Sequence, residues 1–103
     1  MVIGTAKSIN GVTVRLTDER WAHILEARPY MLNYEQDVLD AVENPELVLR
    51  AAGGALVAVV SFGRRGFLHA IYREMSRSDG FIITAYFNDS YNRRQVLWRA
   101  SDK

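Results

Sequence analysis

The chain has 103 residues, 49% of them hydrophobic, which is enough to bury the core of one domain without disulfides or metal. It contains no cysteine, which excludes disulfides, thiolate metal ligands and thiol nucleophiles and is typical of the reducing cytoplasm. No apolar run approaches the ~18 residues that span a bilayer, so we expect a cytoplasmic protein with no membrane partner.

The two halves of the sequence carry opposite charge. Residues 1–46 contain four basic and eight acidic side chains, a net charge of −4, whereas residues 47–103 contain nine and four, a net charge of +5. Eleven of the thirteen basic residues are arginine, whose planar guanidinium group can bind phosphate bidentately. The second half therefore favours an anionic ligand such as phosphate, with ordinary surface charge as the alternative.

The first expected elements are a β-hairpin and a helix. Two β-type runs, 2–9 and 12–16, are joined by Asn10-Gly11, a dipeptide that favours tight hairpins. Thr17 is expected to cap a helix that extends to about Ala27, because acidic residues follow it and apolar residues then recur at helical spacing.

A second helix and a group of strands follow. A capping-box pattern from Asn33 predicts the start of the second helix, and Asn44-Pro45 ends it. Four β-rich runs separated by short turns are then expected, at 47–50, 56–62, 67–74 and 81–87. Short turns between successive strands indicate an antiparallel sheet. Residues 91–103 are expected to form a short final helix or a flexible basic arm.

The expected fold is therefore a single α+β domain over residues 1–103. Its N-terminal hairpin is followed by two helices that pack on a mainly antiparallel four-stranded sheet.

The sequence shows no pattern typical of a metal or nucleotide site. Its two histidines, His23 and His69, lie in different elements without a second ligand nearby, and no glycine-rich phosphate loop leads from a strand into a helix. We therefore expect no metal and no cofactor. The remaining His, Arg, Thr and Tyr side chains are sufficient for a ribonuclease that uses the 2′-hydroxyl of RNA as the nucleophile.

The two histidines have different expected environments. His23 lies about 200° around the helical wheel from Trp21, so its ring is expected to face away from the core and be available to a ligand. A solvent-exposed histidine without a role explains the same pattern. His69 alternates with Phe67 and Ile71 along a strand, which favours a half-buried packing residue over an acid or base.

Several strand residues are candidates for binding phosphate. Arg73 ends one strand, and Arg50 lies on a strand that is otherwise apolar. Thr84 and Tyr86 are two residues apart, on the face that alternation also assigns to Ile82, and could bind a phosphate and stack a base. Ordinary strand composition is the alternative explanation for both.

One segment resembles a known group of nucleases. Residues 16–24, Leu-Thr-Asp-Glu-Arg-Trp-Ala-His-Ile, look like the opening helix of a phage and bacterial group within the barnase/EndoU/colicin/RelE superfamily. The later landmarks of that group match Asn44-Pro45, Arg50 and the run 81–86, Phe-Ile-Ile-Thr-Ala-Tyr. The resemblance covers residues 16–87.

This resemblance implies a RelE/barnase-like fold and a metal-independent endoribonuclease, often a toxin encoded with a small antitoxin protein. By matching positions it implies that His23 is the catalytic histidine, Thr84 the strand hydroxyl of the site and Tyr86 its neighbour. The resembled proteins often carry a His-Pro pair after the first helix, where this chain has Arg28-Pro29. The catalytic acid–base pair is then incomplete, or part of its role falls to Arg28.

We therefore predict a toxin-type endoribonuclease that cleaves RNA by transesterification and binds a small cognate antitoxin. The predicted catalytic residues are His23, Arg50, Arg73, Thr84 and Tyr86, and the predicted substrate-binding residues are Arg20, Arg28, Arg64, Arg65 and Tyr72. Two other functions stay open at this stage. The chain could be a non-catalytic module that binds RNA or a protein, or a structural partner that uses its acidic helices as an interface.

Overall fold

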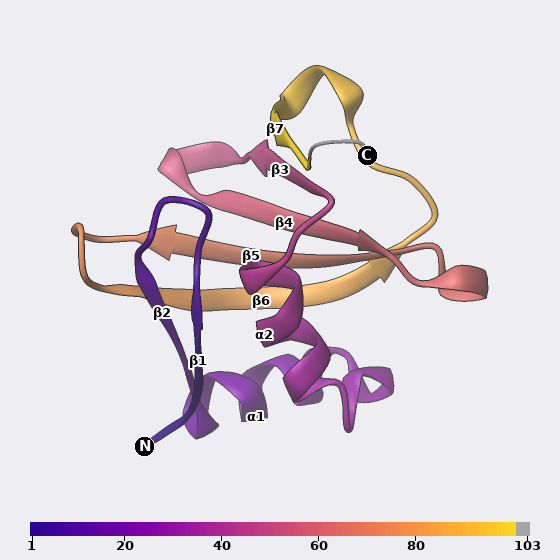
Figure 1. The fold of residues 1–103 in the computed structure, drawn as a ribbon. Coiled ribbons are helices and arrows are strands. Elements are labelled where there is room, and N and C mark those ends of the chain that lie inside the picture. The colour runs from indigo at the N-terminus through magenta and orange to yellow at the C-terminus, as the bar shows by residue number, and fades with distance from the viewer. Residues whose placement is uncertain (101–103) are drawn as a thin grey trace.

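A hairpin, two helices and five further strands follow one another along the chain in the computed structural model, which describes residues 1–100 (Figure 1). The strands are β1 (Val2–Lys7), β2 (Thr13–Thr17), β3 (Leu47–Arg50), β4 (Leu56–Ser61), β5 (Phe67–Glu74), β6 (Gly80–Asn88) and β7 (Val96–Arg99). The helices are α1 (Asp18–Ala27) and α2 (Glu35–Glu43), and short 3₁₀ turns are η1 (Pro29–Met31), η2 (Ala52–Gly54), η3 (Gly63–Arg65) and η4 (Arg93–Gln95).

All seven strands belong to one sheet, in the order β1-β2-β6-β5-β4-β3-β7. The predicted four-stranded sheet is wrong in this detail, although the α+β class and the antiparallel meander β3–β6 are present. The N-terminal hairpin joins the sheet because β2 pairs with β6, in the one parallel contact among the described strands. A parallel pair needs a long connection, so no local turn signal in the sequence points to it.

Burial and charge hold the hairpin beside β6. Val14 and Leu16 of β2 have no exposed surface, and between them Arg15 forms an ion pair with Asp79, just before β6, with Nε 2.8 Å from Oδ1. The Arg15 guanidinium lowers the pKa of the Asp79 carboxyl through a hydrogen bond and its charge. The ion pair therefore links β2 to the turn from which its parallel partner begins.

The C-terminal segment is part of the sheet rather than a free arm over its described length. Residues 96–99 form β7, which pairs antiparallel with β3, and only the single turn η4 before it is helical. Residues 101–103 of the predicted arm lie outside the described residues. This pairing joins segments about fifty residues apart, which local sequence patterns do not reveal.

The helix starts differ in how well the sequence predicted them. Thr17 caps α1 as predicted, because its hydroxyl accepts a hydrogen bond from the backbone N–H of Arg20. The predicted cap of α2 at Asn33 is wrong: Asn33 adopts a positive φ of 76° and the helix begins at Glu35, after Tyr34.

Within residues 1–100, no helix is long and apolar enough to cross a membrane.

The two faces of the sheet are covered by different parts of the chain. Trp21 and Ile24 of α1 and Val38 and Val42 of α2 pack with β5 and β6 in the main core. A smaller cluster on the opposite face joins β3 and β4 to side chains of the segment that leads to β7, including Tyr91. Figure 1 shows the two helices together on one side and the η4–β7 segment on the other.

An irregularity in the β5–β6 pairing determines which β6 residues face the helices. Ile71 pairs with Thr84, but the next β5 residue, Tyr72, pairs with Ile82, so Ile83 is an extra residue. Ile82 is consequently buried in the helix-side core, whereas Thr84 keeps the face away from the helices. Strict alternation had placed Ile82 and Thr84 on the same face, and the bulge corrects that prediction.

The η3 turn depends on glycine at position 66. Gly66 has φ 84° and ψ −115°, and an added Cβ would collide with the carbonyl oxygen of Asn88. We expect Gly66→Ala to lower the free energy of unfolding by about 2–3 kcal/mol, measured by urea denaturation. Gly63→Ala is the matched control, because φ is 59° there but nothing lies within 4 Å of a Cβ, and we expect a loss of about 1 kcal/mol. Equal losses would contradict the assigned collision.

Candidate functional site

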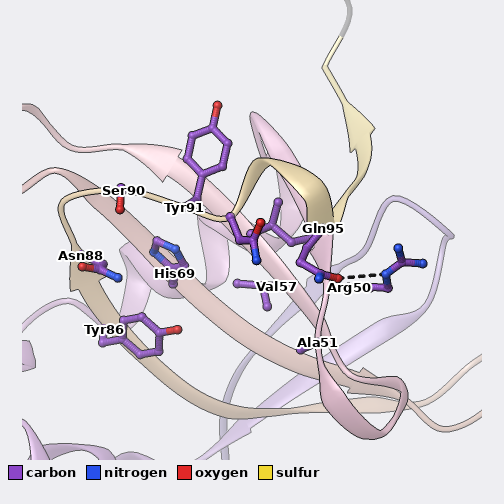
Figure 2. Close-up of a pocket in the computed structure, with 11 residues that line it drawn as sticks. Arg50, Ala51, Val57, His69, Tyr86, Asn88, Ser90, Tyr91 and Gln95 are labelled. Carbon is purple, nitrogen blue, oxygen red and sulfur yellow. Dashed lines mark hydrogen bonds between the residues drawn. The ribbon is translucent and has the colours of Figure 1, made fainter.

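A cleft of about 420 Å³ opens on the sheet face opposite the helices (Figure 2). Arg50 of β3, His69 of β5 and Tyr86 of β6 line it from the sheet. Tyr91 and Gln95 line it from the segment that leads from β6 to β7. We call this the open-face cleft. Charged, aromatic and amide side chains from distant parts of the sequence meet in it.

Strand geometry places these side chains on one face. Leu68 and Ala70 point into the helix-side core, so the residue between them, His69, points to the opposite face. His69 pairs with Tyr86 on β6, which brings the two rings side by side. The ring centroids are 5.0 Å apart with an interplanar angle of 17°, a stacked arrangement.

The His69 imidazole is held in one tautomer. Only 4% of the residue is exposed, and Nδ1 lies 3.1 Å from the carbonyl oxygen of Phe67. Because a carbonyl oxygen can only accept, Nδ1 carries the proton and Nε2 retains a lone pair. Burial lowers the pKa of His69 below its usual value. The ring is therefore neutral at pH 7, and its burial agrees with the packing position that the sequence favoured over an acid or base.

Arg28 reaches the same face from the end of α1. Its Nη1 lies 3.3 Å from the Thr84 hydroxyl oxygen, to which it donates, and its Cζ lies 5.1 Å from the centre of the Tyr86 ring. Arg28, Thr84, Tyr86 and His69 thus form a continuous row across β6 and β5, which we call the Arg28–His69 row. Figure 2 shows the His69 and Tyr86 end of this row.

Arg50 lies at the far end of the cleft, with its guanidinium directed away from His69 and Tyr86 (Figure 2). Its side chain is exposed, and Nε donates to the Gln95 amide oxygen over 2.9 Å (Figure 2). Within residues 1–100, neither Arg50 nor Arg28 lies within ion-pair distance of a carboxylate. Both guanidinium groups therefore retain charge and donors for an anionic ligand.

His23 does not lie at this site. It is exposed on α1, as predicted, but the shallow hollow beside it is lined by α1 itself, with Glu19 and Glu26 among the lining residues. Arg28 follows His23 by five residues, about 140° around the helix axis. When Arg28 is directed toward β6, the His23 ring therefore points elsewhere. The structure brings no predicted arginine into the hollow at His23.

The other predicted site residues are dispersed. Arg73 donates to the Gly53 carbonyl oxygen in the η2 turn, and Arg20 lies on α1. Tyr72 has no exposed surface and packs in the helix-side core, so it cannot touch a substrate in this structure. Burial also raises the pKa of its hydroxyl. Arg64 and Arg65 lie in the η3 turn.

Four predicted residues do converge, and several others in the cleft were not predicted. Arg28, Thr84 and Tyr86 share the Arg28–His69 row, and Arg50 lies across the cleft. Sequence reasoning missed His69, Asn88, Tyr91 and Gln95 as cleft residues. The shared strand face was a usable signal for His69. The other three depend on the path of the segment before β7.

No three His, Asp or Glu side chains within the described part of the chain are grouped so as to hold a metal ion. Comparisons with protein-family models, with curated proteins and with solved structures returned no match for this chain. Membership of the barnase/EndoU/colicin/RelE superfamily therefore stays a prediction from the sequence.

The lowered pKa of His69 predicts a pH-dependent stability. Below about pH 6.5 an unfolded histidine takes up a proton that the buried ring resists, so the unfolded state is favoured and stability falls on acidification. We expect the wild type to lose more stability than His69→Gln between pH 7.5 and 5.5, measured by urea midpoints. Parallel losses in the two proteins would show that the ring protonates freely in the folded state.

Proposed function

We propose that the chain is an endoribonuclease that binds single-stranded RNA in the open-face cleft and cleaves it without a metal ion. The observation that supports this best is the Arg28–His69 row, which places a guanidinium, a hydroxyl, a phenol ring and a neutral imidazole in direct succession. These are the groups that phosphodiester transesterification needs, and sequence resemblance to a nuclease superfamily agrees with the assignment.

The charges and rings of the cleft suit a single RNA strand. Arg28 and Arg50 have no carboxylate partner within residues 1–100, so a phosphate would supply the missing negative charge. Tyr91 contributes an aromatic side chain to the cleft wall, and bases of unpaired RNA stack readily on such rings. A duplex buries its bases, which makes a single strand the better substrate.

In the proposed reaction, His69 is the general base. Its Nε2 takes the proton of the 2′-hydroxyl, the 2′-oxygen forms a bond to phosphorus, and the bond from phosphorus to the 5′-oxygen breaks. The Tyr86 hydroxyl donates the proton that the departing 5′-oxygen needs. Arg28 and Arg50 stabilise the negative charge that builds up on the phosphoryl oxygens. The products are a 2′,3′-cyclic phosphate and a 5′-hydroxyl end.

His69 replaces His23 in this proposal because of where each ring lies. His69 lines the open-face cleft and stacks on Tyr86, whereas His23 lies beside two glutamates on α1. A phosphate would be repelled by those glutamates and attracted by the arginines of the cleft.

Paired histidine variants test the proposal. In buffer with chelator, the wild type is expected to cleave single-stranded RNA to cyclic-phosphate ends, detected by end mapping. His69→Gln is expected to lose about 10²–10⁴-fold in cleavage rate, because general base catalysis contributes that much, while RNA binding is retained. His23→Gln, on the acidic surface of α1, is expected to cleave at the wild-type rate.

The reverse pattern would return the catalytic role to His23, as the sequence resemblance implies. Absence of cleavage by the wild type over the whole range of RNA substrates would reject the nuclease assignment. Circular dichroism of each variant serves as the control for folding.

A non-catalytic RNA-binding module is the second candidate, and the burial of His69 is the observation that favours it. With 4% of the residue exposed, the imidazole could serve only to support Tyr86 against the bound strand. This function predicts that RNA binds without being cleaved, with Arg28 and Arg50 again at the phosphates.

Salt dependence measures the phosphate contacts under either candidate. Arg50→Ala is expected to weaken binding of single-stranded RNA and to reduce the slope of log K against log salt by about 0.7, because one phosphate contact is lost. Arg77→Ala, an exposed arginine in the turn between β5 and β6, is the matched control and is expected to keep the wild-type slope. An unchanged slope for Arg50→Ala would place the phosphate elsewhere.

We further propose that the protein acts as a cytoplasmic toxin held in check by a small antitoxin protein. The support is the resemblance to toxin nucleases together with the two unpaired arginines of the cleft, which an acidic segment of such a partner could neutralise. Co-expression with the product of an adjacent short reading frame, which should relieve growth arrest, tests this part.

A further inference from the structure

An arginine stacked on aromatic rings lies on the helix side of the sheet, near the end of β6 that borders the open-face cleft. The Cζ of Arg65 is 5.1 Å from the ring centre of Tyr34 and 5.1 Å from that of Phe87. Phe62 packs edge-on against both rings, and the ring centre of Tyr30 lies 6.2 Å from that of Phe87. We call Tyr30, Tyr34, Phe62 and Phe87 the aromatic platform. The Arg65 side chain is therefore oriented by rings rather than by a carboxylate.

Arg65 keeps its donors available to a ligand. Arg65 is exposed, and within residues 1–100 it forms no ion pair. Guanidinium groups that stack through their flat faces still present N–H donors along their edge. Stacking thus restricts the side chain without using its hydrogen-bonding capacity, which lowers the entropy lost when an anion binds.

Tyr30 offers an aromatic surface beside this cation. It is 45% exposed, although it is a large ring, and it lies in the η1 turn that follows α1. An exposed ring beside an unneutralised guanidinium is suited to one nucleotide, because the base stacks on the ring and the guanidinium takes the phosphate.

The platform and the cleft lie on opposite faces of β6. Tyr86 points to the cleft, whereas the next residue, Phe87, points to the helix side and packs against the main core. The η3 turn that carries Arg65 packs closely on Asn88, which also lines the cleft. Arg28 and Tyr30 are only two residues apart. A strand that leaves the cleft past Asn88 and passes around this end of the sheet would therefore reach the platform.

We propose that Arg65 and Tyr30 form a second nucleotide subsite, which binds the base and phosphate next to the nucleotides held in the open-face cleft. This inference rests on the proposed function, since it needs RNA in the cleft. It assigns Arg65 a positioning role for substrate. Stacking on Tyr30 makes the subsite tolerant of base identity, so it contributes affinity for longer strands rather than sequence selectivity.

Oligonucleotide length separates this subsite from the cleft. Affinity is measured for a dinucleotide and a tetranucleotide that carry a 2′-deoxy group at the scissile position, which prevents cleavage. The wild type is expected to bind the tetranucleotide about tenfold more tightly, since one stacked base contributes an effect of that order. Tyr30→Leu and Arg65→Ala are expected to bring the ratio close to one while dinucleotide affinity is unchanged, which also shows that both variants fold.

Conservative and distant variants complete the design. Tyr30→Phe keeps the ring and is expected to retain the wild-type ratio, and Arg77→Ala removes a charge at the opposite end of β5 and is also expected to retain it. A wild-type ratio in Tyr30→Leu and Arg65→Ala, or equal weakening at both lengths, would overturn the subsite. If the wild type cleaves RNA but binds the dinucleotide and the tetranucleotide equally tightly, the subsite is overturned and the proposed function stands. Failure to bind either oligonucleotide would overturn both proposals.

Discussion

The pairing of β5 with β6 is the constraint on which the rest of the molecule depends. It sends Leu68 and Ala70 into the helix-side core and leaves His69 beside Tyr86 on the opposite face. The bulge at Ile83 then rotates the first part of β6, so that an apolar side chain enters the core while the strand's hydroxyl remains on the cleft side. One strand pair therefore completes the core and also builds the proposed catalytic surface.

The end of α1 connects the helical layer to that surface. Arg28 passes from the helix to Thr84 and Tyr86, at the position where resembled nucleases often carry a histidine. A guanidinium there holds charge at any physiological pH but does not exchange protons, so in the proposed nuclease proton transfer has to come from another group. We propose the buried neutral imidazole of His69 on the adjacent strand as that group. We infer that the chemistry of the site is divided between charge from α1 and proton transfer from the sheet.

Local sequence patterns predicted the elements well and their assembly only in part. The Thr17 cap and the bounds of β3 and β5 agree with prediction because each depends on neighbouring residues and alternation. The seven-stranded sheet was not foreseen, since the β2–β6 and β3–β7 pairs join segments far apart in the chain. The Asn33 cap failed because the backbone there takes a left-handed turn before the helix starts.

The sequence by itself determined the residue types that reach the candidate site and the absence of cysteine, because composition and strand alternation are local properties. Thr84 and Tyr86 could be placed together in this way, whereas Arg28 was selected only through the resemblance to the nuclease group. Only the tertiary structure decided that His69 rather than His23 lies with them, because the choice depends on which side of α1 faces the sheet and on cross-strand pairing. Such proximity arises from packing between distant segments, which no single stretch of sequence encodes.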